Sequence, residues 1–333
     1  MFRDFYQNNW SSEIENELQQ LLKIAVAEDA GHTGDLTSLA LIPEQLYGSA
    51  TIRSRENGVM AGVQAVPAIL KAINPALEWQ PNITDGSLIL SGDKIGLLKG
   101  SVQSILIAER LVLNLLGKLS GIATLTKKYV EAVAGTPAKI YDTRKTTLGW
   151  RRLEKYAVRC GGGRNHRTGL FDAVLIKDNH LAVGHIGHNS SKHNNRNNSG
   201  QFTPAEAVVQ TREFFRLHSD SFHFESFHES FHKNENQSAP FIPIIEIEVD
   251  TLEQLQEVLP VKPDIVLLDN MALPQLIQAV EIRNNLAPEV ELEASGGINL
   301  KTVGNIATTG VERISVGALT HSAIALDLGL DWD

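Results

Sequence analysis

Six short β-branched runs alternate with helical stretches in the second part of the chain, and this alternation constrains the fold more than any other feature. The runs lie at 139–141, 173–176, 244–249, 265–268, 290–294 and 313–316. Near-continuous apolar strands separated by helices are typical of a parallel sheet that helices cover. The pattern therefore predicts an α/β fold, as an open sheet or as a barrel.

Polar or glycine residues stand at the end of each run. In (β/α) barrels the carboxyl ends of the strands form the face that binds ligands, so these residues should meet there. They are Asp142, Arg144, Lys145, Lys177, Asp178, Glu246, Glu248, Asp269, Ser295, Gly296, Gly297 and Gly317. We therefore predict a barrel active site at this face.

The longest interval between strand ends contains a segment of unusual composition. Residues 185–240 are rich in Asn, Ser and His and include three copies of Ser-Phe-His. We expect a low-complexity surface insertion, interrupted by one helix at 204–217. Clustered histidines could bind a transition metal, but their spacing matches no closed zinc site, which favours a tolerated loop expansion.

The charges are unevenly distributed. A formal net charge of −9 argues against a general affinity for nucleic acids or anionic membranes. Residues 139–167, however, contain nine Lys and Arg residues against two acidic ones. This concentration is typical of a protein that binds small anions.

Within that stretch, residues 141–147 should leave a strand and enter a helix. Arg144, Lys145, several hydroxyl groups and free helix N–H groups would then bind carboxylate or phosphate. The predicted helix 148–160 places Arg151, Lys155 and Arg159 on one face, which could bind anions or be only a solvated face.

Further donors follow in the glycine-rich turn 161–167. His166 and Arg167 stand there side by side, and arginine suits bidentate contacts with carboxylates. The turns at 295–298 and 316–321 expose backbone N–H groups after late strands, a common phosphate site in barrels.

Acidic residues end two neighbouring strands. Glu248 and Asp269 could serve a divalent ion, ribose hydroxyls or a developing positive charge. Glu246 faces the same way as Glu248, and periodicity leaves open which of them reaches a ligand.

The pattern of residues up to about 134 predicts a smaller α+β region. Ser12 and Glu15 form a capping-box pair before an amphipathic helix, strands and turns occupy 48–103, and two helices follow at 105–118 and 122–134. Cys160 is the only cysteine, and no apolar segment is long enough to span a bilayer, so we expect a soluble cytoplasmic protein.

Several ordered motifs resemble the quinolinate phosphoribosyltransferase family, and together they cover nearly the whole chain outside the insertion. The motifs are Ala27–Asp29 with Gly34–Ser38, Glu109–Asn114, Ser120–Thr124, Asp142–Thr147, Leu153–Arg159, Gly161–Arg167, Leu175–His180, Glu246–Val249, Leu268–Met271, Glu293–Ile298 and Gly317–His321. The match departs from the family at Leu148, where proline is usual.

The resemblance implies an α/β sandwich domain at 1–121, onto which 322–333 folds back, and an open barrel of about seven parallel strands at 122–321. It also implies a homodimer or a larger dimer-based assembly. The implied reaction joins quinolinate to phosphoribosyl pyrophosphate with Mg²⁺, and gives nicotinate mononucleotide, pyrophosphate and CO2.

The resemblance also implies residue roles. Arg144, His166, Arg167 and Lys177 would hold quinolinate, with Arg110 reaching over from the partner subunit. Lys145 would be catalytic on the pyrophosphate side. Glu248 and Asp269 would be catalytic and would contact ribose or the metal, directly or through water. The phosphoribosyl pyrophosphate site would further include Ser295, Gly296, Gly297, Gly317 and His321.

Three other functions compete with this one. A relative of the same fold could act on another acceptor, although so many cations favour a dicarboxylate. A barrel lyase could use Lys177 as a Schiff-base amine. A metal-binding or interaction protein could be built on the insertion.

Overall fold

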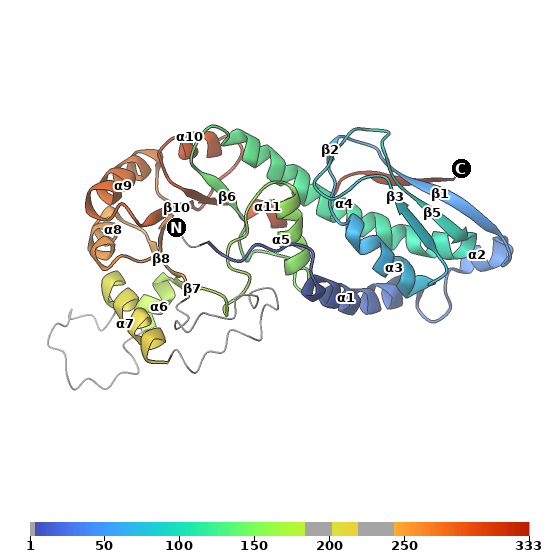
Figure 1. Cartoon of the computed structure of the whole chain (residues 1–333), viewed down its shortest axis with the longest axis horizontal. Coiled ribbons are helices and arrows are strands. Elements are labelled where there is room, and N and C mark those ends of the chain that lie inside the picture. The colour runs from blue at the N-terminus through green and yellow to red at the C-terminus, as the bar shows by residue number, and fades with distance from the viewer. Residues whose placement is uncertain (1–3, 184–201, 219–242, 333) are drawn as a thin grey trace, which may run out of the picture. The chain divides into compact units, whose positions relative to one another are not determined.

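The computed structural model describes residues 4–183, 202–218 and 243–332. The chain divides into two compact units (Figure 1). We call the first the parallel-sheet unit, which comprises Met1–Phe5, Gly135–Ala138 and Gly169–Ser315. The second is the antiparallel-sheet unit, which comprises Tyr6–Ala134, Lys139–Thr168 and Val316–Asp333. The sequence-based domain division near residue 121 stays a prediction.

The antiparallel-sheet unit is built on a four-stranded sheet. Its strand order is β12 (Leu328–Trp332), β1 (Tyr47–Ser54), β5 (Lys94–Ser101) and β3 (Glu78–Pro81). Central β1 pairs antiparallel with both neighbours, so that Ala50 lies opposite Leu98 on one side and Trp332 on the other. The last strand of the chain thus completes the sheet that the first strand begins. A second, two-stranded sheet joins β2 (Gly58–Val59) to β4 (Leu88–Ile89).

Helices and one short strand complete this unit. They are α1 (Ser12–Ala30), α2 (Leu36–Leu41), the 3-10 turn Val63–Ala65, α3 (Val66–Ile73), α4 (Val102–Ala132), β6 (Lys139–Tyr141), α5 (Arg151–Cys160) and α11 (Ala318–His321). The predicted capping box at Ser12 is wrong by one residue: the side chain of Ser11 accepts from Ile14 N–H, while Glu15 accepts from the Trp10 indole. Either serine of a Ser-Ser pair offers the same hydroxyl, so the pattern could not select between them.

The two helices predicted between 105 and 134 are one continuous helix, α4. Gly117 and Gly121 lie within this helix and allow another segment to come close. A Cβ atom would lie 2.9 Å from the Leu326 carbonyl oxygen at Gly117 and 2.0 Å from that of Ile324 at Gly121. The glycines therefore serve close packing against residues 324–326 and leave the helix intact.

Among its described residues, the parallel-sheet unit has five strands in chain order. They are β7 (Val174–Ile176), β8 (Ile245–Val249), β9 (Ile265–Asp269), β10 (Glu291–Ser295) and β11 (Arg313–Ser315), and each pairs in parallel with the next. With β6, all six predicted β-branched runs are strands, which confirms the α/β fold. The first four residues of β9 are all buried, as expected where helices cover a parallel sheet.

Helices connect these strands. They are α6 (Asp178–Val183), α7 (Pro204–Leu217), α8 (Leu252–Val258) with the 3-10 turn Leu259–Val261, α9 (Leu273–Leu286) and α10 (Val303–Ala307). The helix predicted at 204–217 is confirmed as α7, which begins with a capping box between Thr203 and Glu206. Most of the predicted insertion at 185–240 lies outside the described residues.

The start of the chain packs onto this unit. The Arg313 side chain is 3% exposed and contacts Asp4 at 3.0 Å, Glu291 at 2.5 Å and the ring of Phe5. A buried guanidinium needs such partners, because a charge left unpaired away from water is costly. Within the ranges that the structure describes, every helix is too short or too polar to cross a membrane.

Candidate active site

Residues 142–150 form a loop, so the helix predicted at 148–160 is confirmed with a later start. Helix α5 begins only at Arg151. Gly149 adopts a φ of 77°, which interrupts a right-handed helix, and Thr147 N–H donates to the Glu154 side chain at 3.1 Å. Ligand contacts of this loop therefore depend on its side chains and not on a helix N-terminus.

Lys145, Gly317 and His321 lie close together in the antiparallel-sheet unit. A Cβ atom on Gly317 would lie 3.1 Å from Lys145 Cδ and 3.2 Å from His321 Nε2. The Thr320 hydroxyl donates to the Lys145 carbonyl oxygen at 2.7 Å and ties the loop to α11. An exposed ammonium, an imidazole and a glycine backbone thus converge, which is a donor set for a phosphate group.

Arg144, beside them, is half-buried. Its Nε atom is buried and has no hydrogen-bond partner among the described residues. Buried donors are nearly always paired in folded proteins, so an unpaired guanidinium nitrogen indicates a group that a ligand satisfies.

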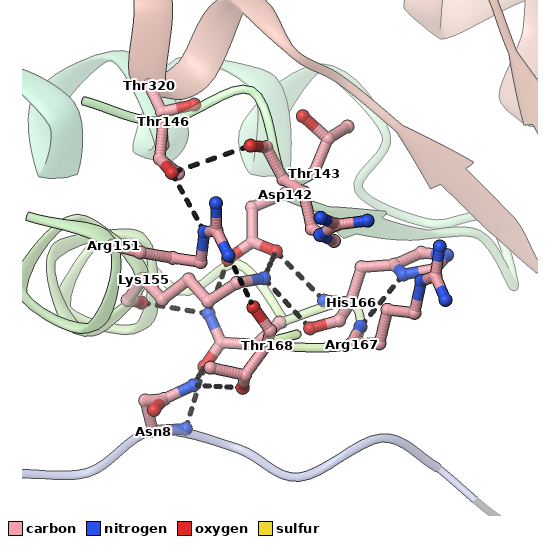
Figure 2. Close-up of polar contacts among 12 residues, drawn as sticks. Asn8, Asp142, Thr143, Thr146, Arg151, Lys155, His166, Arg167, Thr168 and Thr320 are labelled. Atoms are coloured by element: carbon pink, nitrogen blue, oxygen red, sulfur yellow. Dashed lines mark hydrogen bonds and ion pairs between the residues drawn. The ribbon is translucent and has the colours of Figure 1, made fainter. Parts of the chain in front are cut away.

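The turn containing His166 and Arg167 is anchored by a buried ion pair (Figure 2). Lys155 is fully buried, forms a short ion pair with Asp142 and donates to the His166 carbonyl oxygen at 2.8 Å. Asp142 also accepts from His166 N–H at 2.9 Å. Burial raises the pKa of the Asp142 carboxyl, and the Lys155 ammonium opposes that rise. The ion pair therefore fixes both ends of the His166 main chain.

A solvated face is the wrong interpretation for Lys155. Helix α5 directs the Lys155 side chain inward, where it pairs with the equally buried Asp142 carboxylate. A buried carboxylate without such a partner would be costly. The two arginines of the same face also hold the chain: Arg151 donates to Thr146 Oγ1 at 3.0 Å, and Arg159 donates to the Gly163 carbonyl at 2.9 Å.

His166 and Arg167 are 5% and 6% exposed. Arg167 N–H donates to His166 Nδ1 at 2.8 Å, so this nitrogen is the acceptor and the ring proton lies on Nε2. The turn therefore has a fixed tautomer and two fixed side chains. Such a turn suits a rigid planar anion better than a flexible one.

The parallel-sheet unit carries the acidic residues. Lys177 follows β7 and forms a short ion pair with Glu248, whose side chain is 12% exposed. Glu246, two residues earlier on β8, is fully buried. Solvent access therefore favours Glu248 as the ligand-contacting residue of the two.

Asp269 ends β9 directly beside Ser295, which ends β10. The Asn270 side chain donates to Asp269 Oδ2 at 2.7 Å, and its N–H donates to the Ser295 carbonyl at 3.0 Å. Asn270 adopts a φ of 53°, and a Cβ atom on Gly296 would lie 2.2 Å from Asn270 Oδ1. Glycine is thus required at Gly296 by sterics, and the carboxylate of Asp269 is held beside the glycine turn.

Two predicted residues remain. Gly297 adopts a φ of 62° with open space around it, which leaves its backbone accessible. Arg110 is exposed on α4.

Each unit thus brings together a part of the predicted set. In the antiparallel-sheet unit these are Lys145 with Gly317 and His321, and His166 with Arg167. In the parallel-sheet unit they are Lys177 with Glu248, and Asp269 with Ser295 and Gly296. Asp142 was predicted at the ligand-binding strand ends and Lys155 on a helix face that could bind anions, but the structure gives both a buried role that supports the turn. Asn165 also supports the turn and was not singled out, since a buried polar residue leaves no periodic signal.

The fold and the donor set define a phosphoribosyltransferase, and comparison with known proteins places the chain in one family of that class. Residues 35–120 match the N-terminal domain of quinolinate phosphoribosyl transferase, and residues 122–213 and 220–331 match its C-terminal domain. The chain belongs to the quinolinate phosphoribosyltransferase family.

Individual relatives agree with this family. The chain is 38% identical to the chloroplastic nicotinate-nucleotide pyrophosphorylase [carboxylating] of Arabidopsis thaliana, over 95% of this chain and 83% of that protein. It is also 38% identical to the enzyme of that name from Mycobacterium leprae, over 93% of this chain and 95% of that protein. The solved nicotinate-nucleotide pyrophosphorylase of Francisella tularensis superposes with a TM-score of 0.79 at 32% identity, covering 99% of this chain and all of the other.

Proposed function

We propose that this chain transfers a phosphoribosyl group from phosphoribosyl pyrophosphate to the ring nitrogen of quinolinate and releases CO2. The products are nicotinate mononucleotide and pyrophosphate, a step of de novo NAD synthesis. The observation that carries the proposal is the turn containing His166 and Arg167. Asp142 and Lys155 hold its main chain, so that the two buried donor side chains lie next to each other in one fixed geometry. Family membership supplies the reaction class, and the residue chemistry supplies the roles.

Quinolinate is a planar dianion, and the proposed holders of its carboxylates are donors. His166 offers Nε2–H, while Arg144, Arg167 and Lys177 offer positive charge. The unpaired Nε of Arg144 supports this assignment, because a carboxylate would satisfy it. Monocarboxylate acceptors would leave part of this set unpaired, which favours the dicarboxylate.

The phosphate groups would be bound by Lys145, His321 and the backbone of Gly317. Lys145 would place its ammonium on the departing pyrophosphate, where negative charge develops in the transition state. His321 and the backbone of Gly317 would hold a phosphate beside it. Ser295, Gly296 and Gly297 would contribute a second phosphate-binding turn, in which the positive φ angles of the two glycines would direct backbone N–H groups toward a ligand.

Loss of pyrophosphate builds positive charge on the ribose ring. Carboxylates stabilise such a charge, and Glu248 and Asp269 are the accessible acids at neighbouring strand ends. Both offer hard oxygen ligands, which fits Mg²⁺ held by one or two carboxylates together with substrate phosphates. Bound Mg²⁺ would neutralise charge on the pyrophosphate. Once the ring nitrogen is alkylated, its positive charge stabilises the carbanion left by CO2.

A homodimer, or a larger assembly of dimers, completes the proposal. Arg110 is exposed on α4, so its guanidinium is available to reach the quinolinate site of a partner subunit. We place the enzyme in the cytoplasm, supported by its single cysteine, Cys160, which is free.

The test is an assay of the purified chain with quinolinate, phosphoribosyl pyrophosphate and Mg²⁺. We expect nicotinate mononucleotide and pyrophosphate in equal amounts, loss of turnover on chelation of Mg²⁺, and at least tenfold lower kcat/KM with nicotinate as acceptor. Equal turnover of nicotinate would contradict the substrate assignment. Borohydride trapping of an adduct on Lys177 would instead indicate a Schiff-base lyase; in this structure the Lys177 amine contacts Glu248.

A further inference from the structure

Asn165 immediately precedes the His166–Arg167 turn and is fully buried. Its side-chain Nδ2 donates to Asp142 Oδ2 at 2.6 Å and to the Lys155 carbonyl at 2.8 Å. Its Oδ1 accepts from the main-chain N–H of Asn8 at 2.7 Å and from the Asn8 side chain at 3.3 Å. Asn165 therefore joins the buried ion pair to the segment near the start of the chain.

The main chain of Asn165 is held from the same side by Gln7. Asn165 N–H donates to Gln7 Oε1 at 2.9 Å, and Gln7 Nε2 donates to the Asn165 carbonyl at 3.0 Å. A side-chain amide that binds both main-chain groups of one residue reproduces the pairing a neighbouring strand would provide. Arg164 pairs with Tyr141 in a parallel bridge, and Gln7 provides the corresponding main-chain contacts for Asn165.

Asn8 is 1% exposed. Its side chain also reaches the Thr168 hydroxyl at 3.4 Å, on the other side of the two ligand-binding residues. Gln7 and Asn8 thus contact the turn immediately before and immediately after His166 and Arg167. Burying so many polar groups is favourable only while each is paired, so the contacts depend on one another.

We propose that Gln7 and Asn8 are positioning residues for the quinolinate subsite: through Asn165 and Thr168 they fix the backbone from which His166 and Arg167 bind the carboxylates. The substrate in this statement rests on the proposed function. Lys145 and His321 are tied to each other through Thr320 and Gly317, a set of contacts that does not include Asn165. The effect should therefore be selective for quinolinate over phosphoribosyl pyrophosphate.

Two alanine variants with matched controls test the proposal by steady-state kinetics. Gln7→Ala removes both bonds to the Asn165 main chain, and Gln19→Ala removes an exposed glutamine of α1. Asn8→Ala is compared with Asn9→Ala, whose asparagine is exposed. We expect Gln7→Ala to raise KM for quinolinate about tenfold, the equivalent of about 1.4 kcal/mol, with KM for phosphoribosyl pyrophosphate changed less than about twofold. Asn8→Ala should act in the same direction.

Hydrogen exchange of the free enzyme gives a readout that needs no substrate. In Gln7→Ala the amides of residues 163–168 should exchange faster than in the wild type. Gln7→Glu keeps the acceptor for Asn165 N–H, so its amides should exchange at a rate between those of the wild type and Gln7→Ala. Unchanged exchange and an unchanged KM would overturn the proposal, as would an equal rise in KM for both substrates. Absence of quinolinate turnover in the wild type would instead count against the proposed function, and the exchange experiment would still decide the positioning role.

Discussion

The loop at 142–147 and the turn at 163–168 both belong to the cationic stretch of the chain, but they differ in how they are held. Lys145 of the loop is exposed, and Arg144 is half-buried. The turn is buried and is held by Asp142, Lys155 and the segment at Gln7–Asn8. On the proposed assignment, the exposed Lys145 side chain would be able to adjust to a flexible polyphosphate, whereas the turn would present a fixed geometry to a planar acid.

The difference between the loop and the turn can be tested first at Lys155, which holds the turn, and then at Lys145, which lies in the loop. Lys155→Met removes the partner of buried Asp142, so we expect a loss of about 3–5 kcal/mol in the free energy of unfolding, the usual cost of breaking a buried ion pair. Urea denaturation monitored by circular dichroism measures this loss. Adding Asp142→Asn should recover part of it, since the uncompensated charge is then gone. A Lys155→Met variant as stable as the wild type would show that the pair does not hold the turn.

Lys145→Ala should leave stability unchanged, because the side chain is exposed, but it should lower kcat about 10²–10³-fold, as expected for loss of one transition-state charge partner. Lys139→Ala, an exposed lysine at the start of the same stretch, serves as the control and should retain kcat. Near-normal turnover of Lys145→Ala would contradict the catalytic role that we assign to the loop.

A smaller effect should follow from Thr320→Val, which removes the bond between α11 and the loop carbonyl of Lys145. One lost neutral hydrogen bond is worth about 1 kcal/mol, so KM for phosphoribosyl pyrophosphate should rise about fivefold while KM for quinolinate stays constant. Thr308→Val removes a similar bond on an exposed helix end and provides the control. A matching rise in both KM values would mean that the loop and the turn respond as one unit.

The smallest predicted effect concerns Asp85, which accepts from the hydroxyl of Tyr156 on α5 at 2.8 Å. Burial raises the pKa of Asp85, and hydrogen bonds from Val63 N–H and Tyr156 oppose this rise. The folded state therefore binds the Asp85 proton more tightly than the unfolded state does. This tighter binding stabilises the fold at low pH, and the stabilisation is lost as the pH rises from about 4, the pKa of Asp85 in the unfolded chain, through the raised pKa of the folded state. Urea denaturation from pH 4 to 7 should show the stability of the wild type falling relative to Asp85→Asn. A difference independent of pH would contradict this.

The sequence was sufficient to predict the six strands and to place Asp269 and Ser295 at strand ends, because apolar runs and their polar ends leave a pattern. It could not show that Lys155 is buried: on the predicted helix face Lys155 is indistinguishable from a solvated lysine until Asp142 is placed. Asn165 and Asn8 are 157 residues apart, and no local signal joins them. The continuity of α4 was missed for a similar reason, since only residues 324–326 explain its glycines.

The central claim is that the acceptor is a pyridine dicarboxylate that loses one defined carboxylate. The most direct measurement uses quinolinate labelled with ¹⁴C at the 2-carboxylate or at the 3-carboxylate, with phosphoribosyl pyrophosphate and Mg²⁺. We predict labelled CO2 from the 2-carboxylate in equal amount to nicotinate mononucleotide, with the 3-carboxylate label retained in the nucleotide. Release of the 3-carboxylate label, or of CO2 without phosphoribosyl pyrophosphate, would contradict the account.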